Sequence, residues 1–137
     1  VSMKNTIFFF IIGFLVLSAC AMQAQREVVN LVPKQVQELL EAKEEMGLFV
    51  LNVHTPYEGK LEKTDAIIED WENIAAHKDQ LPNDKHAPIL VYCRSGRMST
   101  SAVKQLQDLG YTDIYHLNGG MKAWDAQGLP VIDKAWK

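Results

Sequence analysis

The sequence is poor in cysteine and lacks the residue spacings that hold a metal ion or a redox-active dithiol. Its 137 residues include two cysteines, Cys20 and Cys93, and four histidines. No Cys-X-X-Cys pair occurs, and the histidines do not stand at the intervals typical of zinc ligands. These absences exclude a thioredoxin-like dithiol and a structural zinc site, and we expect no metal centre.

An excess of positive charge, long runs of one charge and internal repeats are also missing. Lys and Arg total 14 against 17 Asp and Glu, which gives a formal net charge of −3 and a pI near 5.8. A nucleic-acid-binding protein normally presents a basic face, so we expect no nucleic-acid partner. The hydrophobic fraction of 47% and the charged fraction of 23% are ordinary for a globular protein. The length suits one domain.

The apolar run at the N-terminus is too short to cross a bilayer comfortably. Residues 7–17 are largely apolar and follow the cation Lys4, whereas a membrane-spanning helix needs about 20 residues. A cation followed by such a run is typical of a secretory signal peptide. The run ends in Leu17-Ser18-Ala19-Cys20, which resembles the lipobox of bacterial lipoproteins.

The lipobox resemblance implies that Cys20 carries a diacylglyceryl group and begins the mature chain. We therefore expect a signal peptide over residues 1–19, a tether over 20–27 and one folded domain over 28–137. Two or more acyl chains anchor a protein stably, so we expect an exported protein, lipid-anchored to a bacterial cell membrane in the periplasm or at the cell surface. The alternatives are a plain signal peptide cleaved nearby and a leader helix with an incidental cysteine.

Behind this leader, strand-like and helix-like segments alternate. The predicted strands cover residues 28–32, 48–53, 66–68, 88–92 and 113–117. The predicted helices cover residues 33–46, 71–81, 99–109 and 121–127. The alternation indicates an α/β domain with a parallel sheet covered by helices on both faces. Ligands bind at the carboxyl ends of the strands in such sheets, and Cys93 directly follows the strand at 88–92.

The loop that begins at Cys93 combines a thiol with groups that attract anions. Its N–H groups, the N-terminus of the predicted helix and two arginines all favour the thiolate. The same groups would bind an anionic substrate, so Cys93 is interpreted as a catalytic nucleophile. A buried structural cysteine is the alternative. The predicted substrate-binding residues are Arg94, Ser95, Gly96, Arg97, Met98 and Ser99.

This loop resembles the active-site loop of single-domain rhodaneses, and residues 50–56 and 117–131 resemble two other signatures of that family. The resemblance implies a five-stranded parallel sheet flanked by helices. It also implies a sulfurtransferase in which Cys93 takes sulfane sulfur from a small anionic donor, thiosulfate or a persulfide, and passes it to a thiol or to cyanide. No cofactor is implied, and we expect a monomer.

Two residues depart from the first signature. Asn52 stands where the family has Asp, and His54 stands where it has Arg. The family pair is interpreted as structural, so the departures bear on donor preference more than on the chemistry at Cys93. A phosphatase of related fold would carry Arg six residues after its cysteine, where this chain has Ser99. A non-enzymatic persulfide carrier or partner-binding module stays open as the alternative to catalysis.

Position in the loop predicts different roles for the two arginines. Arg97 lies near the helix start and is expected to contact the bound anion, whereas Arg94 is expected to point toward solvent. The histidines are interpreted as surface or strand-end residues, namely His54, His77, His86 and His116.

Overall fold

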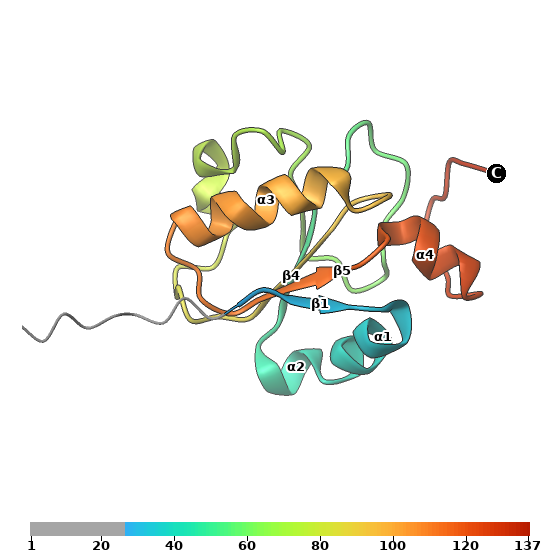
Figure 1. Ribbon diagram of the computed structural model, residues 1–137, viewed down its shortest axis with the longest axis horizontal. Coiled ribbons are helices and arrows are strands. Elements are labelled where there is room, and N and C mark those ends of the chain that lie inside the picture. Colours follow the sequence, from blue (N-terminus) through green and yellow to red (C-terminus); the bar gives the residue numbers. More distant parts are fainter. Residues whose placement is uncertain (1–26) are drawn as a thin grey trace, which may run out of the picture.

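The computed structural model describes residues 27–137, which form a five-stranded parallel sheet (Figure 1). The strands are β1 (Val29–Leu31), β2 (Phe49–Asn52), β3 (Ala66–Ile67), β4 (Ile89–Tyr92) and β5 (Ile114–Leu117). They lie in the order β1-β5-β4-β2-β3, and every neighbouring pair is parallel. The predicted sheet is confirmed, and β4 lies at its centre. The predicted signal peptide, Cys20 and nearly all of the tether lie outside the described residues.

Helices cover both faces of the sheet, as predicted. They are α1 (Pro33–Glu41), α2 (Lys43–Met46), the 3₁₀ helix η1 (Ile74–Gln80), α3 (Arg97–Asp108) and α4 (Gly120–Ala126). One buried cluster joins α3 and η1 to the sheet, and a second joins α1 and α4 to the opposite face. In Figure 1, α4 lies beyond the carboxyl end of β5. That end of the sheet is where Cys93 begins its loop.

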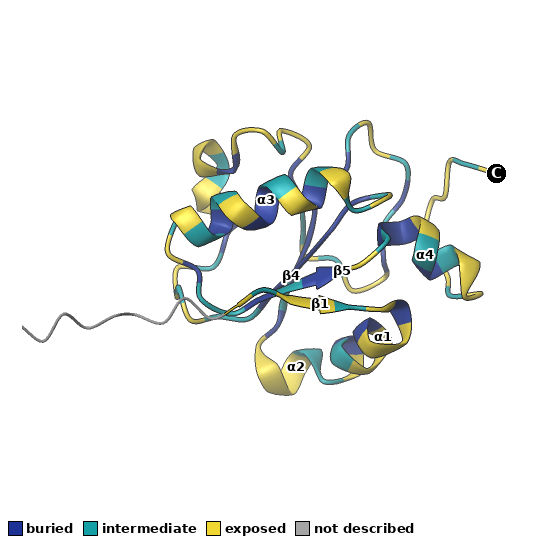
Figure 2. Cartoon of the chain, viewed as in Figure 1, coloured by how far each residue is buried: buried dark blue, intermediate teal, exposed yellow. Residues whose placement is uncertain are grey.

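The side chains of β4 alternate between these two clusters, and the alternation directs Cys93 toward α3. Ile89 and Val91 belong to the cluster under α3, while Leu90 and Tyr92 belong to the cluster under α1 and α4. All four are buried, which gives the strand its dark blue colour in Figure 2. Because successive side chains of a strand point to opposite faces, Cys93 falls on the α3 side and joins that cluster.

The helix predicted over residues 33–46 is divided at Ala42 into α1 and α2. Lys43, the first residue of α2, donates from Nζ to both carboxylate oxygens of Asp65 at 2.9 Å. The same ammonium donates to the Leu48 carbonyl at 3.1 Å. These bonds draw α2 toward the start of β2 and toward the chain before β3, which a straight continuation of α1 would not reach.

Two further helix starts differ from the prediction. Within residues 71–81 the helix begins only at Ile74, because Gln105 of α3 engages the segment before it. The Gln105 side chain accepts a hydrogen bond from the Ile74 N–H at 2.9 Å and donates to the Trp71 carbonyl at 2.7 Å. At the other end of the sheet, α3 begins at Arg97, two residues before the predicted start.

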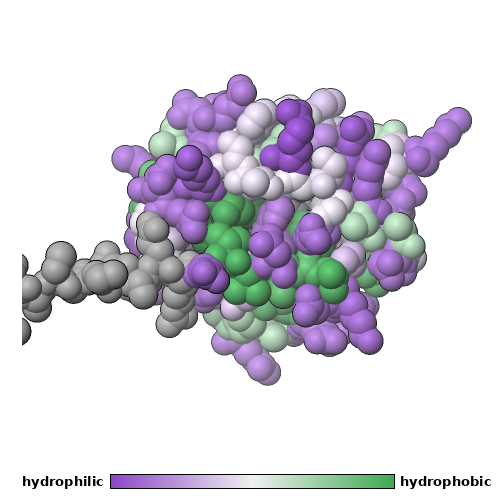
Figure 3. Space-filling model, in the orientation of Figure 1, coloured by the Kyte–Doolittle hydropathy of each residue, from purple (hydrophilic) through white to green (hydrophobic). Residues whose placement is uncertain are grey.

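Apolar side chains gather on the face of the molecule shown in Figure 3, between the regions of α3 and α1. Among the strands of residues 27–137, β1 lies at the edge and pairs with β5 alone. Val29 on this edge is 43% exposed, and Val32 just after it is 49% exposed.

Among residues 27–137, no helix has the length and apolar character needed to cross a membrane.

The hydroxyl of Tyr92 ties β4 to the chain between β2 and β3. Tyr92 Oη accepts a hydrogen bond from the Leu61 N–H at 2.9 Å and lies 2.6 Å from Thr64 Oγ1. Burial of the side chain raises the pKa of Tyr92 to about 12. The hydroxyl is therefore neutral at physiological pH and acts as a structural hydrogen-bonding group.

We predict that Tyr92→Phe lowers the free energy of unfolding by about 1–3 kcal/mol, because the buried Leu61 N–H loses its acceptor. Tyr57→Phe is the matched control, since Tyr57 is 37% exposed and its hydroxyl meets Asp133 at the surface. The control should change stability by less than about 0.5 kcal/mol. Denaturant unfolding measures both, and equal losses would contradict the role given to Tyr92.

Candidate active site

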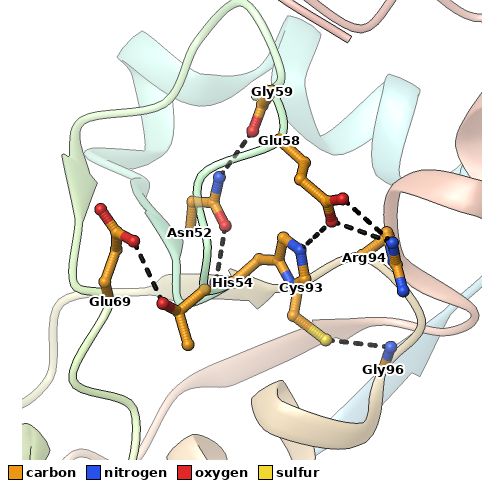
Figure 4. Close-up of polar contacts among 9 residues, drawn as sticks. Asn52, His54, Glu58, Gly59, Glu69, Cys93, Arg94 and Gly96 are labelled. Atoms are coloured by element: carbon orange, nitrogen blue, oxygen red, sulfur yellow. Dashed lines mark hydrogen bonds and ion pairs between the residues drawn. The ribbon is translucent and has the colours of Figure 1, made fainter. Parts of the chain in front are cut away.

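Cys93 lies where β4 ends and the chain turns into α3 (Figure 4). Its Sγ accepts a hydrogen bond from the Gly96 N–H at 3.0 Å, and Ser99 Oγ lies 3.3 Å from the same sulfur. Cys93 is only 1% exposed. Loop N–H groups and the N-terminus of a helix stabilise negative charge. The surroundings of Cys93 therefore suit an anionic sulfur shielded from bulk water.

The N-terminus of α4 holds the other side of this loop. The Met121 N–H donates to the Cys93 carbonyl and the Lys122 N–H donates to the Arg94 carbonyl, both at 2.9 Å. These carbonyls therefore point toward α4, and the next turn of the loop brings the Gly96 N–H to the sulfur. Gly96 has a φ of 103°, a left-handed conformation that glycine adopts without strain.

A second polar chain runs from the thiol across β5 to β1. Ser99 Oγ lies 2.6 Å from His116 Nε2, and His116 Nδ1 lies 3.0 Å from Asn30 Oδ1. His116 on β5 pairs with Asn30 on β1, and this register places the two side chains together. His116 is 7% exposed, and its burial lowers its pKa. Of the two interpretations offered for His116, surface or strand-end, the strand-end one holds, because it lies near the end of β5 and is buried under α3.

His54, Glu58 and Arg94 form a third polar chain beside Cys93 (Figure 4). Glu58 bonds through Oε2 to His54 Nε2, and its two carboxylate oxygens accept from Arg94 Nη1 at 3.1 and 3.0 Å. The hydrogen bond with His54 lowers the pKa of Glu58, and the charge of Arg94 adds to that effect. Glu58 is therefore ionised at neutral pH. His54 lies just after the end of β2 and is 5% exposed, so the strand-end interpretation holds for it as well.

Asn52 shows how the chain accommodates its departure from the first signature. Its Oδ1 accepts a hydrogen bond from the His54 N–H at 2.9 Å, and its Nδ2 donates to the Gly59 carbonyl at 3.0 Å. Asn52 is fully buried. An aspartate could not donate to the Gly59 carbonyl and would bury a charge there. Asparagine thus suits the loop that presents His54 and Glu58.

Arg94 does not point freely into solvent as predicted. Arg94 is half-buried against Glu58, whereas Arg97 is exposed, with its guanidinium 5.9 Å from the centre of the Trp71 ring. Glu58 offers a carboxylate to Arg94, and Trp71 offers an aromatic face to Arg97. The charge of Arg94 is therefore offset by Glu58, and Arg97 presents its charge at the surface.

The other predicted loop residues differ in exposure. Ser95 is exposed, Met98 is half-buried against the cluster under α3, and Ser99 is fully buried. Met98 thus contributes packing, and Ser99 is the hydroxyl that faces the thiol. Within residues 27–137, no group of three or more His, Cys, Asp or Glu side chains is arranged to hold a metal ion.

Sequence analysis missed three residues that the structure brings to the site, namely Asn30, Glu58 and His116. Asn30 and His116 meet only because β1 and β5 pair in one register. Glu58 meets Arg94 across 36 positions of sequence. For His116 the sequence did carry a signal. Side chains alternate along β5, so His116 lies on the same side of the sheet as the apolar Ile114.

Comparison with known proteins agrees with this fold and site. The family of rhodanese-like domains matches residues 32–127. An uncharacterized protein of Synechocystis sp. is 31% identical over 105 residues, covering 76% of this chain and 56% of that protein. A sulfurtransferase of Allochromatium vinosum is 34% identical over 68 residues, covering 50% of this chain and 62% of that protein. This chain thus spans less than two thirds of the length of these two relatives.

A solved structure has the same fold. The rhodanese-related protein from Thermoplasma volcanium superposes with a TM-score of 0.63 at 25% identity, covering 77% of this chain and 99% of that one. The structure, the family match and the Cys93 loop together define an α/β domain of the rhodanese class. This chain belongs to the rhodanese-like domain family.

The support that α4 gives to the Cys93 loop can be tested at Gly120. A Cβ atom at Gly120 would lie 2.5 Å from the carbonyl oxygens of Cys93 and Arg94, whereas one at Gly128 would meet nothing within 4 Å. Both glycines have a positive φ, +60° and +74°, so alanine strains the backbone at each.

We predict that Gly120→Ala lowers the free energy of unfolding by about 1–3 kcal/mol more than Gly128→Ala, on the scale of overpacking in a filled site. The shared backbone strain, about 1–2 kcal/mol, cancels in this comparison. Denaturant unfolding of the two variants and the parent protein gives the difference. A loss at Gly128 as large as that at Gly120 would mean that contact with the Cys93 loop does not restrict this position.

Proposed function

We propose that this protein transfers sulfane sulfur from a small anionic donor, such as thiosulfate or a persulfide, to a thiol or to cyanide. One observation carries the proposal: a single thiol, held at the end of the central strand, accepts a hydrogen bond from a loop N–H and faces the N-terminus of α3. The family match and the sulfurtransferase relative support it.

The reaction has two displacement steps. The Cys93 thiolate attacks the outer sulfur of thiosulfate, a bond forms between the two sulfurs, and sulfite leaves with the electron pair of the broken S–S bond. The acceptor, a thiolate or cyanide, then attacks the outer sulfur of the Cys93 persulfide, and Cys93 leaves as a thiolate. The same N–H group that faces Sγ stabilises the sulfur in each anionic form.

The charge distribution around the loop supports an anionic donor. Arg97 presents its guanidinium at the surface beside the first turn of α3, where it attracts anions over a distance that shortens as ionic strength rises. Arg94 is held by Glu58. We therefore assign the guiding role to Arg97, in place of Arg94.

We predict that Cys93→Ser abolishes sulfur transfer from thiosulfate to cyanide, because an alcohol cannot hold a persulfide. Cys20→Ser is the control, since Cys20 lies outside the residues that match the family, and it should retain the parent activity. Mass spectrometry after thiosulfate treatment should find one added sulfur on the peptide that contains Cys93. Activity in the Cys93→Ser variant would contradict the mechanism, and a persulfide formed without turnover would make the protein a carrier.

We also propose that the chain is exported and held on a bacterial cell membrane by lipid on Cys20. The proposal rests on the Leu17-Ser18-Ala19-Cys20 sequence and the apolar run before it. Expressed in its source cell type, the protein should fractionate with membranes and carry lipid on Cys20, and Cys20→Ala should accumulate as an unprocessed precursor. A mature protein that carries no lipid and begins at another residue would contradict the proposal. The leader would then be a plain export signal.

A further inference from the structure

Four polar groups form an unbroken chain from the buried thiol to the exposed Asn30 at the sheet edge. Cys93 Sγ lies 3.3 Å from Ser99 Oγ, which lies 2.6 Å from His116 Nε2, and His116 Nδ1 lies 3.0 Å from Asn30 Oδ1. Cys93, Ser99 and His116 are 1%, 0% and 7% exposed. Cys93 directly follows β4, and the other three groups come from α3, β5 and β1, so the tertiary structure holds each of them in place.

The hydrogen-bonding capacity of each atom decides where the protons lie. Asn30 Oδ1 can only accept, so His116 Nδ1 carries the proton and Nε2 is left as an acceptor. The single Ser99 hydroxyl proton has three acceptors in reach, Cys93 Sγ at 3.3 Å, the Gly96 carbonyl at 3.2 Å and His116 Nε2 at 2.6 Å. The shortest of these contacts favours donation to His116, which leaves the Ser99 oxygen free to accept from the Cys93 thiol. Burial lowers the pKa of His116, so the imidazole is neutral, and able to take a proton, at pH 7.

The same positions of the heavy atoms also fit the other proton distribution. If the thiol proton moves to Ser99 Oγ while the Ser99 proton moves to His116 Nε2, Ser99 donates to the Cys93 thiolate. His116 then donates from both ring nitrogens, to Ser99 and to Asn30 Oδ1. No heavy atom has to move between the two states, because every hydrogen bond is kept.

We propose that Ser99 and His116 form a proton path that deprotonates Cys93 for attack. As Cys93 attacks, its S–H bond breaks, its proton passes to Ser99 Oγ, and the Ser99 proton passes to His116 Nε2. Burial disfavours the imidazolium, so it forms only during the attack. When the persulfide is consumed and the Cys93 thiolate leaves, the protons return along the same path. The role in sulfur transfer rests on the proposed function, whereas deprotonation of Cys93 does not.

The neighbours of His116 make this path specific to one acid–base pair. Its hydrogen-bond partners within residues 27–137 are Asn30 from β1 and Ser99 from α3, which carry no charge. The residue paired with it on β4 is Val91, and burial is the cause of its pKa shift. The titratable group that His116 meets, through Ser99, is the Cys93 thiol.

The test is the pH dependence of Cys93 alkylation by iodoacetamide in the full chain, followed by mass spectrometry of the Cys93 peptide so that Cys20 does not interfere. In the parent protein the rate should rise in two steps. The first lies below the ordinary histidine value of 6.5, as His116 becomes a neutral base, and the second is a rise at alkaline pH that does not depend on His116. His116→Gln keeps polar atoms near both ring nitrogens but has no basic group.

We expect His116→Gln to lose the first step. Its alkylation rate at neutral pH should fall about a hundredfold, the scale of general acid–base catalysis, and should return to the parent rate at alkaline pH. His86→Gln is the matched control, because His86 is an exposed histidine that bonds to Thr112 away from Cys93. It should leave both steps unchanged.

Ser99→Ala provides a second, independent break in the path. It removes the link to Cys93 but leaves His116 in place, so it should also lose the first step, and the double variant should be no slower at neutral pH than either single variant. Two results would overturn the proposal: a first step that survives in either variant, or a rate that falls equally at every pH, which marks a purely structural role. If His116→Gln does not fold, Ser99→Ala decides alone.

These measurements separate the path from the proposed function. A protein that shows both alkylation steps but transfers no sulfur has the proton path and lacks the proposed activity. A protein that transfers sulfur from thiosulfate but shows a single alkylation step has the activity without the path.

Discussion

The two hydrogen bonds from the N-terminus of α4 to the carbonyls of Cys93 and Arg94 are the contacts on which the site depends. They turn these carbonyls away from the thiol, so the following loop can bring the Gly96 N–H to Sγ. A loop in the reverse orientation would place carbonyl oxygens against the sulfur and repel a thiolate. The approach is close enough that Gly120 has no room for a Cβ atom, which explains a glycine at the start of a helix.

The site also depends on which face of the sheet each side chain takes. Cys93 and His116 follow or belong to adjacent parallel strands, and both lie on the α3 side. Ser99, in the first turn of α3, lies between them. A thiol, a hydroxyl and an imidazole thus meet in a buried space where water does not compete for their hydrogen bonds. In such surroundings each bond is stronger than it would be at the surface.

Glu58 bonds to His54 in one loop beside the thiol and to Arg94 in the other. It therefore offsets the charge of Arg94 and leaves that of Arg97. By holding Arg94 and His54 together, it leaves Arg97 as the loop arginine that presents its charge to solvent. Asn52 supports this arrangement by bonding to the backbone at both ends of the segment from His54 to Gly59. The two departures from the family signature therefore act together in building one wall of the site.

The sequence alone determined the α/β class, the parallel strands, the position of Cys93 and its anion-attracting loop, because these follow from periodicity and from residues adjacent in the chain. The apolar run before Cys93 already predicted the strand that the structure places at the centre of the sheet. Only the tertiary structure decided which arginine meets a carboxylate, because Glu58 lies far from Arg94 in sequence. It also decided that His116 is buried between Ser99 and Asn30. Those contacts depend on the register of β1 with β5 and on the packing of α3, which no local pattern of residues records.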